Sequence, residues 1–125
     1  MMNRNKIFAG CLILLLPIIF SCTRKIVPSR DPAEFGYLYV EAVKQKLMGN
    51  GGDALKYFEQ CIRINPASDA SYYQMAQIVS AGGDIHNGKK YVLKALSVDG
   101  KNLWYLMMIA GMYYQEKNLD SALIY

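Results

Sequence analysis

The chain has 125 residues, of which 53% are apolar, and this length suffices for one small domain but not for two. Its formal net charge is only +4, and His86 is its single histidine, so neither a histidine-based triad nor a metal site with several imidazoles can be assembled. We therefore expect no catalytic site, no metal and no cofactor.

The N-terminal block has the order of a secretory signal. Arg4 and Lys6 precede Ile7 to Phe20, a run of apolar and small residues. This run is too short for a membrane-spanning helix of roughly 20 residues, so residues 1–21 are predicted to be a signal peptide that is removed. A signal anchor retained as a short membrane helix is the alternative. Without Arg4 and Lys6, 12 basic residues stand against 10 acidic ones, and this near balance predicts no nucleic-acid partner.

Residues 19–22, Ile-Phe-Ser-Cys, resemble a bacterial lipobox, in which a small residue precedes a cysteine that is acylated and becomes the new N-terminus. The resemblance implies lipidation of Cys22, with residues 22–31 as a tether between the membrane and the fold. No acidic residue follows Cys22 directly, which favours an outer-membrane anchor facing the periplasm. Cys61 is then the only thiol left, and its place on an apolar helical stripe predicts a core residue.

Six helices are expected after the tether. Asp31 is a suitable N-cap and Pro32 a suitable first helical residue, so the first helix should begin there. The apolar residues recur with helical spacing from that point to the end of the chain. The predicted ranges are 32–48, 51–64, 69–81, 85–98, 103–116 and 119–125.

The same residue types recur at an interval of 34. Small residues that allow close helix packing recur at Ala42, Ala76 and Ala110 and at Ala54, Gly88 and Ala122. N-cap residue types recur at Asn50, Asp84 and Asn118, and glycines precede the first two of them at Gly49 and Gly83. These intervals predict hairpins of two helices, stacked side by side.

Residues 53–66, DALKYFEQCIRINP, resemble the second helix of a tetratricopeptide repeat with its terminal proline. The match extends over residues 35–125, although Gly88 and Gly100 replace the usual alanine and proline. It implies an all-α fold for residues 32–125: an α-solenoid of antiparallel hairpins, coiled into a right-handed superhelix of about two and a half to three repeats. Polar Glu41, Lys44 and Gln45 in the first helix predict an N-terminal capping unit with a hydrated outer face. Together with the lipobox, the repeats resemble tetratricopeptide lipoproteins of the Bacteroidetes type.

The resemblance also implies a binding site. Proteins of this family generally bind an extended peptide or a partner helix in a concave groove lined by the first helix of each hairpin. Carried over by position, the groove residues are Tyr39, Val43, Lys46, Tyr73, Gln77, Ser80, Trp104, Met107 and Tyr114. Aromatic residues are prominent among them, as in the energetic centres of many interfaces. The lysine and asparagine positions that grip a C-terminal carboxylate in some members hold Tyr39, Val43 and Gln77, so no such clamp is expected.

These expectations describe a membrane-anchored scaffold that binds a peptide or helix of an envelope protein. An alternative is a sensory or accessory input segment of a longer regulatory protein, and a purely structural spacer is a third possibility. Residues 121–125 should leave an apolar helix face uncovered. We therefore expect either self-association through this end or further repeats beyond it.

Overall fold

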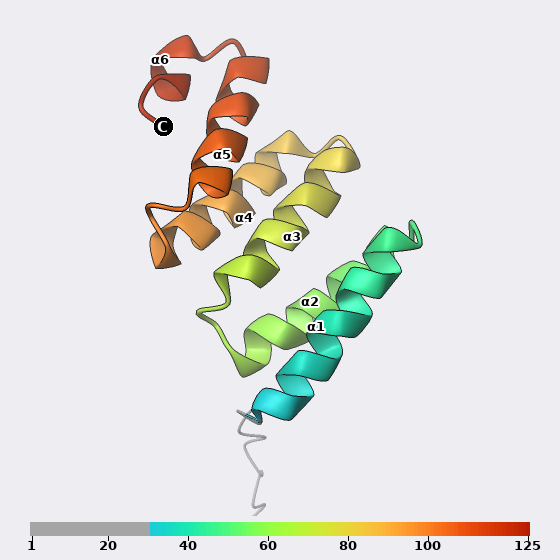
Figure 1. The fold of residues 1–125 in the computed structure, drawn as a ribbon. Helices are drawn as coiled ribbons and strands as arrows, with labels where there is room; N and C mark the ends of the chain where they lie inside the picture. The colour runs from blue at the N-terminus through green and yellow to red at the C-terminus, as the bar shows by residue number, and fades with distance from the viewer. Residues whose placement is uncertain (1–30) are drawn as a thin grey trace, which may run out of the picture.

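The computed structural model describes residues 31–125, so the predicted signal peptide, Cys22 and nearly all of the predicted tether lie outside the described residues. Every regular element in residues 31–125 is a helix (Figure 1). The bounds are α1 Pro32–Leu47, α2 Gly51–Ile64, α3 Asp69–Ala81, α4 Ile85–Val98, α5 Leu103–Gln115 and α6 Leu119–Ala122. The predicted all-α fold is confirmed.

The predicted helix bounds agree with the observed ones to within one residue, except at the end of the last helix. The expected range 119–125 is wrong, because α6 ends at Ala122. The amide of Leu123 still bonds to the carbonyl of Leu119, but the amide of Ile124 bonds to Ser121, only three residues back. Bonds of that type tighten the last turn of a helix and end it.

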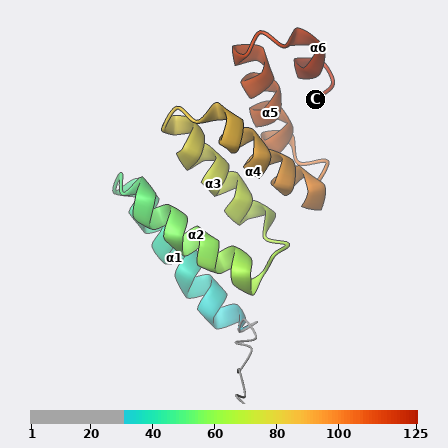
Figure 2. The same ribbon diagram turned by 180° about the vertical axis from the view of Figure 1, so that it is seen from behind.

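The six helices form three hairpins, α1–α2, α3–α4 and α5–α6, arranged in a row (Figure 1). In that view α1 and α3 lie in front of their partners α2 and α4, and the view from behind reverses this order (Figure 2). We call the side formed by α1, α3 and α5 the first-helix face. Contacts are concentrated between helices that are neighbours in the sequence, as expected for a solenoid.

The turn inside each hairpin repeats one backbone geometry. Gly49 and Gly83 have φ values of +82° and +93°, a region that glycine enters without a steric penalty. In each turn the next amide bonds to a carbonyl five residues back, from Asn50 to Gln45 in the first hairpin. This pattern is a Schellman motif, which satisfies the last carbonyls of a helix. In the third hairpin Lys117 takes the same place with a φ of +58°.

Side-chain caps fix most helix starts. Asp31 accepts a hydrogen bond from the amide of Ala33 at 2.9 Å, as its position before Pro32 predicts. Asp84 and Asn118 also cap their helices through side-chain oxygens. Asn50 is the exception: its side chain makes no cap bond, and its amide nitrogen donates to Gln45 instead. The expected N-cap position is therefore right, but the expected capping bond is absent.

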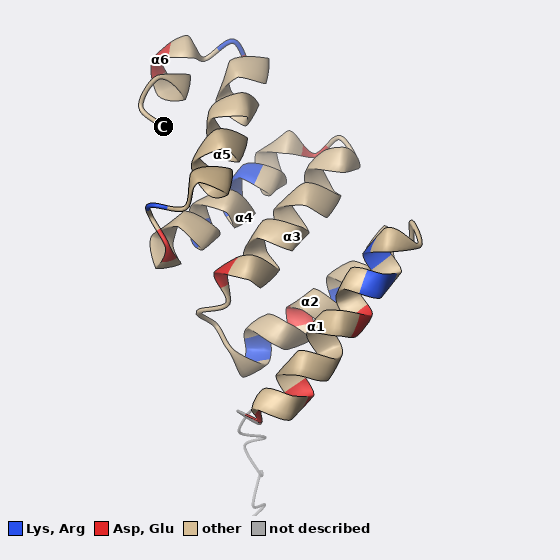
Figure 3. Ribbon diagram, in the orientation of Figure 1, with Lys and Arg blue, Asp and Glu red and all other residues tan. Residues whose placement is uncertain are grey.

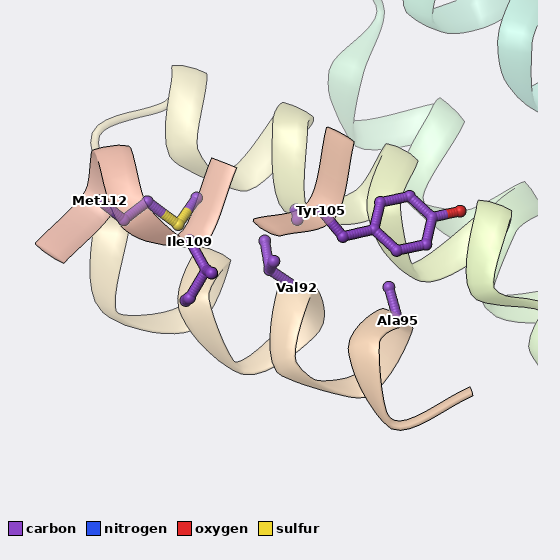
Figure 4. Close-up of a cluster of buried hydrophobic side chains, with 6 residues drawn as sticks. Val92, Ala95, Tyr105, Ile109 and Met112 are labelled. Carbon is purple, nitrogen blue, oxygen red and sulfur yellow. The ribbon is translucent and has the colours of Figure 1, made fainter. Parts of the chain in front are cut away.

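The core lies where small residues let neighbouring helices approach. Ala42 on α1 and Ala54 on α2 are fully buried and cluster with Phe58 of α2 and Met75 of α3. The equivalent cluster joins the second hairpin to α5 (Figure 4). Its members are Ala76, Val92, Ala95, Tyr105, Ile109 and Met112. Each hairpin is thus held to the next by apolar side chains from the following first helix.

A third, smaller cluster closes the N-terminal side of the row. Leu38 packs with Cys61 and Ile64, and the Cys61 side chain is completely buried. Burial raises the pKa of the Cys61 thiol, which keeps it protonated. The prediction that Cys61 is a core residue is confirmed.

Charged residues are distributed unevenly. The sequence of α5 contains none, so this helix is entirely tan in Figure 3. At its C-terminal end Lys89 of α4 donates to Glu116 and lies 4.7 Å from the centre of the Tyr113 ring. Among residues 31–125, no helix combines the length and the apolar content that crossing a membrane requires.

Candidate protein-binding face

Tyr39 on α1 is a packing residue for most of its surface. Its ring is stacked on Phe35, with 5.9 Å between ring centres, and meets Phe58 edge-on at 5.6 Å. Burial raises the pKa of its hydroxyl above the usual value. Tyr39 therefore joins α1 to the core of the first hairpin, and only part of its ring is open to a partner.

Lys46 connects two first helices. Its ammonium group donates to the side-chain oxygen of Gln74 at 2.6 Å and to that of Gln77, both on α3. The side chain is half-buried, and burial lowers the pKa of Lys46. Sequence analysis treated Lys46 as a groove cation and did not select Gln74. Within residues 31–125 these three side chains form a polar bridge from α1 to α3.

Tyr73 and Ser80 on α3 also contact neighbouring helices. The ring of Tyr73 lies 4.8 Å from that of Tyr105 on α5, measured between ring centres. The hydroxyl of Tyr105 donates to Asp69 at 2.9 Å, and burial together with this bond raises the pKa of Tyr105 far above its ordinary value. Ser80 faces Gly88 of α4, and its buried hydroxyl has no hydrogen-bond partner.

The α5 members of the predicted site are exposed instead. Trp104, Met107 and Tyr114 retain 66%, 58% and 68% of their accessible surface. Together with the lack of charge on α5, this exposure produces an uncovered apolar surface on the last first helix. Large apolar side chains left in water mark surfaces that can gain free energy by binding.

Two hollows lie along the first-helix face at the interval of the repeat. The hollow between α1 and α3 has a volume of about 320 Å³, and the hollow between α3 and α5 one of about 340 Å³. Residues 34 apart line them in turn: Lys46 and Ser80, Gly51 and Ile85, Gln77 and Gly111, Ile78 and Met112, Ala81 and Gln115. The face therefore offers two equivalent shallow depressions, the first more polar and the second richer in methionine.

The predicted site residues thus divide into two groups. Lys46 and Gln77 line the first hollow, while Ser80 and Met107 line the second. Half-buried Tyr39, Val43 and Tyr73 pack against core clusters and line neither hollow. Sequence analysis missed the lining residues Ile78, Ala81, Met108 and Gly111. Their 34-residue spacing from other lining residues is the signal that would have found Ile78 and Ala81.

No group of three or more histidine, cysteine, aspartate or glutamate side chains in residues 31–125 is arranged to hold a metal ion. Among these described residues the face provides hydroxyl, amide and ammonium groups beside apolar side chains. Such a surface can bind another polypeptide by shape, hydrogen bonding and apolar burial.

Residues 69–102, which contain α3 and α4, match the family model of the tetratricopeptide repeat. A curated protein, the tetratricopeptide repeat and J domain-containing co-chaperone DNJ1 of Cryptococcus neoformans var. grubii, is 38% identical over 65 residues. The aligned part covers 52% of this chain and 12% of the co-chaperone.

Solved structures share the arrangement of helices. MamA superposes with a TM-score of 0.68 at 15% identity, covering 71% of this chain and 52% of MamA. The type III secretion chaperone SycD of Yersinia enterocolitica, solved with a peptide of the translocator YopD, superposes with a TM-score of 0.69 at 18% identity. That match covers 74% of this chain and 70% of SycD. The chain thus spans about half of MamA, and its fold is an α-solenoid of tetratricopeptide-type hairpins.

Proposed function

We propose that this protein is an interaction scaffold that binds a peptide or a helix of another protein on its first-helix face. The observation that carries the proposal is the exposed apolar surface of α5, formed by Trp104, Met107 and Tyr114 beside the second hollow. SycD, which has a similar fold, is a chaperone solved with a peptide of its translocator, and this supports a polypeptide as the ligand.

The α5 residues are the proposed anchors. Trp104 and Met107 bring large side chains that are free to be covered, whereas Tyr39 and Tyr73 have already lost much of their surface to core packing. Most of the binding free energy in an interface comes from a few such residues, with tryptophan among the most frequent. Lys46, Gln77 and Ser80 are proposed to orient the ligand through polar contacts along the two hollows.

The position of this scaffold in the cell is also a proposal. The signal-like block and the lipobox-like residues ending at Cys22 support a lipid anchor, through which the solenoid faces the periplasm from the outer membrane. An anchored scaffold of this kind would bind partners within the cell envelope.

Affinity capture from envelope extracts tests the groove. With the full chain as bait, we expect the double variant Trp104→Ala and Met107→Ala to retain less than about one tenth of a specific partner, because it removes two anchors. Leu93→Ala is the matched control, since Leu93 is an exposed apolar residue on α4. Unchanged capture of every partner by the double variant would remove α5 from the binding site.

Lipid labelling tests the anchor. In cells supplied with radioactive palmitate, we expect the natural chain to incorporate label and to sediment with membranes. Cys22→Ser removes the acylated thiol, so the label should be lost and the precursor should remain uncleaved. Cys61→Ser is the control, because Cys61 is buried in the core. Equal labelling of Cys22→Ser would contradict the assignment of Cys22.

A further inference from the structure

Two first helices use the same stripe of residues to pack against the preceding hairpin. On α3 the stripe is Ser71, Met75 and Ile78, and on α5 it is Tyr105, Ile109 and Met112. Within each stripe the residues are spaced i, i+4 and i+7, so they lie on one side of their helix. The two stripes are related by the interval of 34 residues. Each stripe brings two large apolar side chains at its second and third positions.

The surface that receives each stripe is also repeated. Met75 and Ile78 pack on the first hairpin beside the small residues Ala42 and Ala54. Figure 4 shows Ile109 and Met112 directed toward α4 near Val92, the second use of the same arrangement. A methyl group added at Gly88 would lie 3.3 Å from the end of the Met112 side chain, so the fit there is close.

The third hairpin presents this receiving surface uncovered within residues 31–125. A hollow of about 480 Å³ lies between α5 and α6, lined by Ala110, Gly111, Tyr114, Leu119, Ala122 and Leu123. Ala110 and Ala122 stand one repeat after Ala76 and Gly88, where the α5 stripe packs. Leu123 retains 86% of its accessible surface. We call this hollow the end socket.

The first helix of a second copy is a poor occupant of the end socket. The equivalent stripe on α1 is Tyr37, Glu41 and Lys44, in which an ion pair of 3.1 Å replaces the two large apolar residues. Burying Glu41 and Lys44 against Ala110 and Leu123 would remove both charges from water without new partners for them. Head-to-tail stacking of copies is therefore disfavoured.

We infer that the end socket binds an amphipathic helix of a partner protein whose stripe is spaced i, i+4 and i+7, with large apolar side chains at the last two positions. The socket continues an interface that the chain has already built twice, so its shape and its chemistry specify the occupant. This site is separate from the two hollows of the proposed groove, because Leu123 and Ala122 line neither of them.

A helical peptide made from α3 tests the inference. The probe contains residues 69–81, a side-chain bridge between positions 70 and 74 that holds it helical, and a fluorescent label. We expect saturable binding to the full chain by fluorescence anisotropy. Leu123→Asp should weaken this binding by about tenfold or more, because it places a charge in the apolar socket. The same probe carrying Met75→Asp and Ile78→Asp should not bind.

The control variant of the chain is Leu47→Asp, which changes an equally exposed leucine at the end of α1. It should leave binding of the probe unchanged. Absence of saturable binding, or equal binding by Leu123→Asp, would overturn the inference. Dimerisation of the natural chain that Leu123→Asp abolishes would also overturn it, because a second copy would then fill the socket. The capture experiment with Trp104 and Met107 is decided independently of these results.

Discussion

Replacement of Phe58 by alanine is expected to lower the free energy of unfolding by about 3–5 kcal/mol, the largest effect that we predict for a single side chain. Phe58 is completely buried and contacts three elements: its own α2, Tyr39 of α1 and the cluster that includes Met75 of α3. Its removal takes apolar surface from the first hairpin and leaves a cavity at the junction with the second. A domain of this size is stable by only about 5–15 kcal/mol, so the loss is a large fraction of the total.

Urea unfolding followed by circular dichroism at 222 nm measures this effect. The matched control is Tyr37→Ala on α1, which removes an aromatic ring that is 68% exposed and should change the free energy of unfolding by less than about 0.5 kcal/mol. If Phe58→Ala and Tyr37→Ala had equal effects, Phe58 would not hold the first two hairpins together.

Gly88→Val is expected to destabilise the chain by about 1–3 kcal/mol through overpacking. A Cβ atom at this position would lie 2.0 Å from the hydroxyl of Ser80 and 3.3 Å from the end of Met112. The hydroxyl can rotate away, but the branches of valine then meet Met112 and the α3 backbone beside it. Gly88 therefore gives α4 its close approach to α3 and α5.

A double-mutant cycle with Ser80→Ala tests this explanation. Ser80→Ala removes a hydroxyl that is buried and unpartnered, so it should be neutral or stabilising by itself, and it should recover part of the cost of Gly88→Val. Gly111→Val is the control, because a Cβ at Gly111 meets no atom within 4 Å. Additive effects of Ser80→Ala and Gly88→Val would show that the two positions do not compete for space.

The fold was predictable because its determinants are local and repeated. Helix starts depend on residues such as Asp31 and Asp84, whose side chains bond to amides only two or three residues away. The hairpin turns depend on Gly49 and Gly83, which need no distant partner to adopt a positive φ. An interval of 34 residues then relates one hairpin to the next, so the recognition of one unit locates the others.

The chemistry of the face was less predictable, because it depends on pairs of residues from different hairpins. Lys46 is surrounded by Gln74 and Gln77, which lie on another helix, so its sequence neighbours do not reveal that its charge is already engaged. Tyr73 faces the α5 residue Tyr105 in the same way. Only the first-helix positions can be read from the repeat. Whether a side chain there is packed or open depends on the neighbour that the next hairpin supplies.

The turn between α5 and α6 differs from the other two in one respect, since Lys117 adopts the left-handed backbone that Gly49 and Gly83 adopt elsewhere. A residue with a Cβ loses roughly 1–2 kcal/mol in this conformation. The last hairpin therefore begins with a handicap that its two predecessors lack, and α6, with only four residues, offers few bonds to compensate. Among the described hairpins, this one should detach its second helix with the smallest expenditure of free energy, and amide protons in α6 should exchange with solvent before those of α2 or α4.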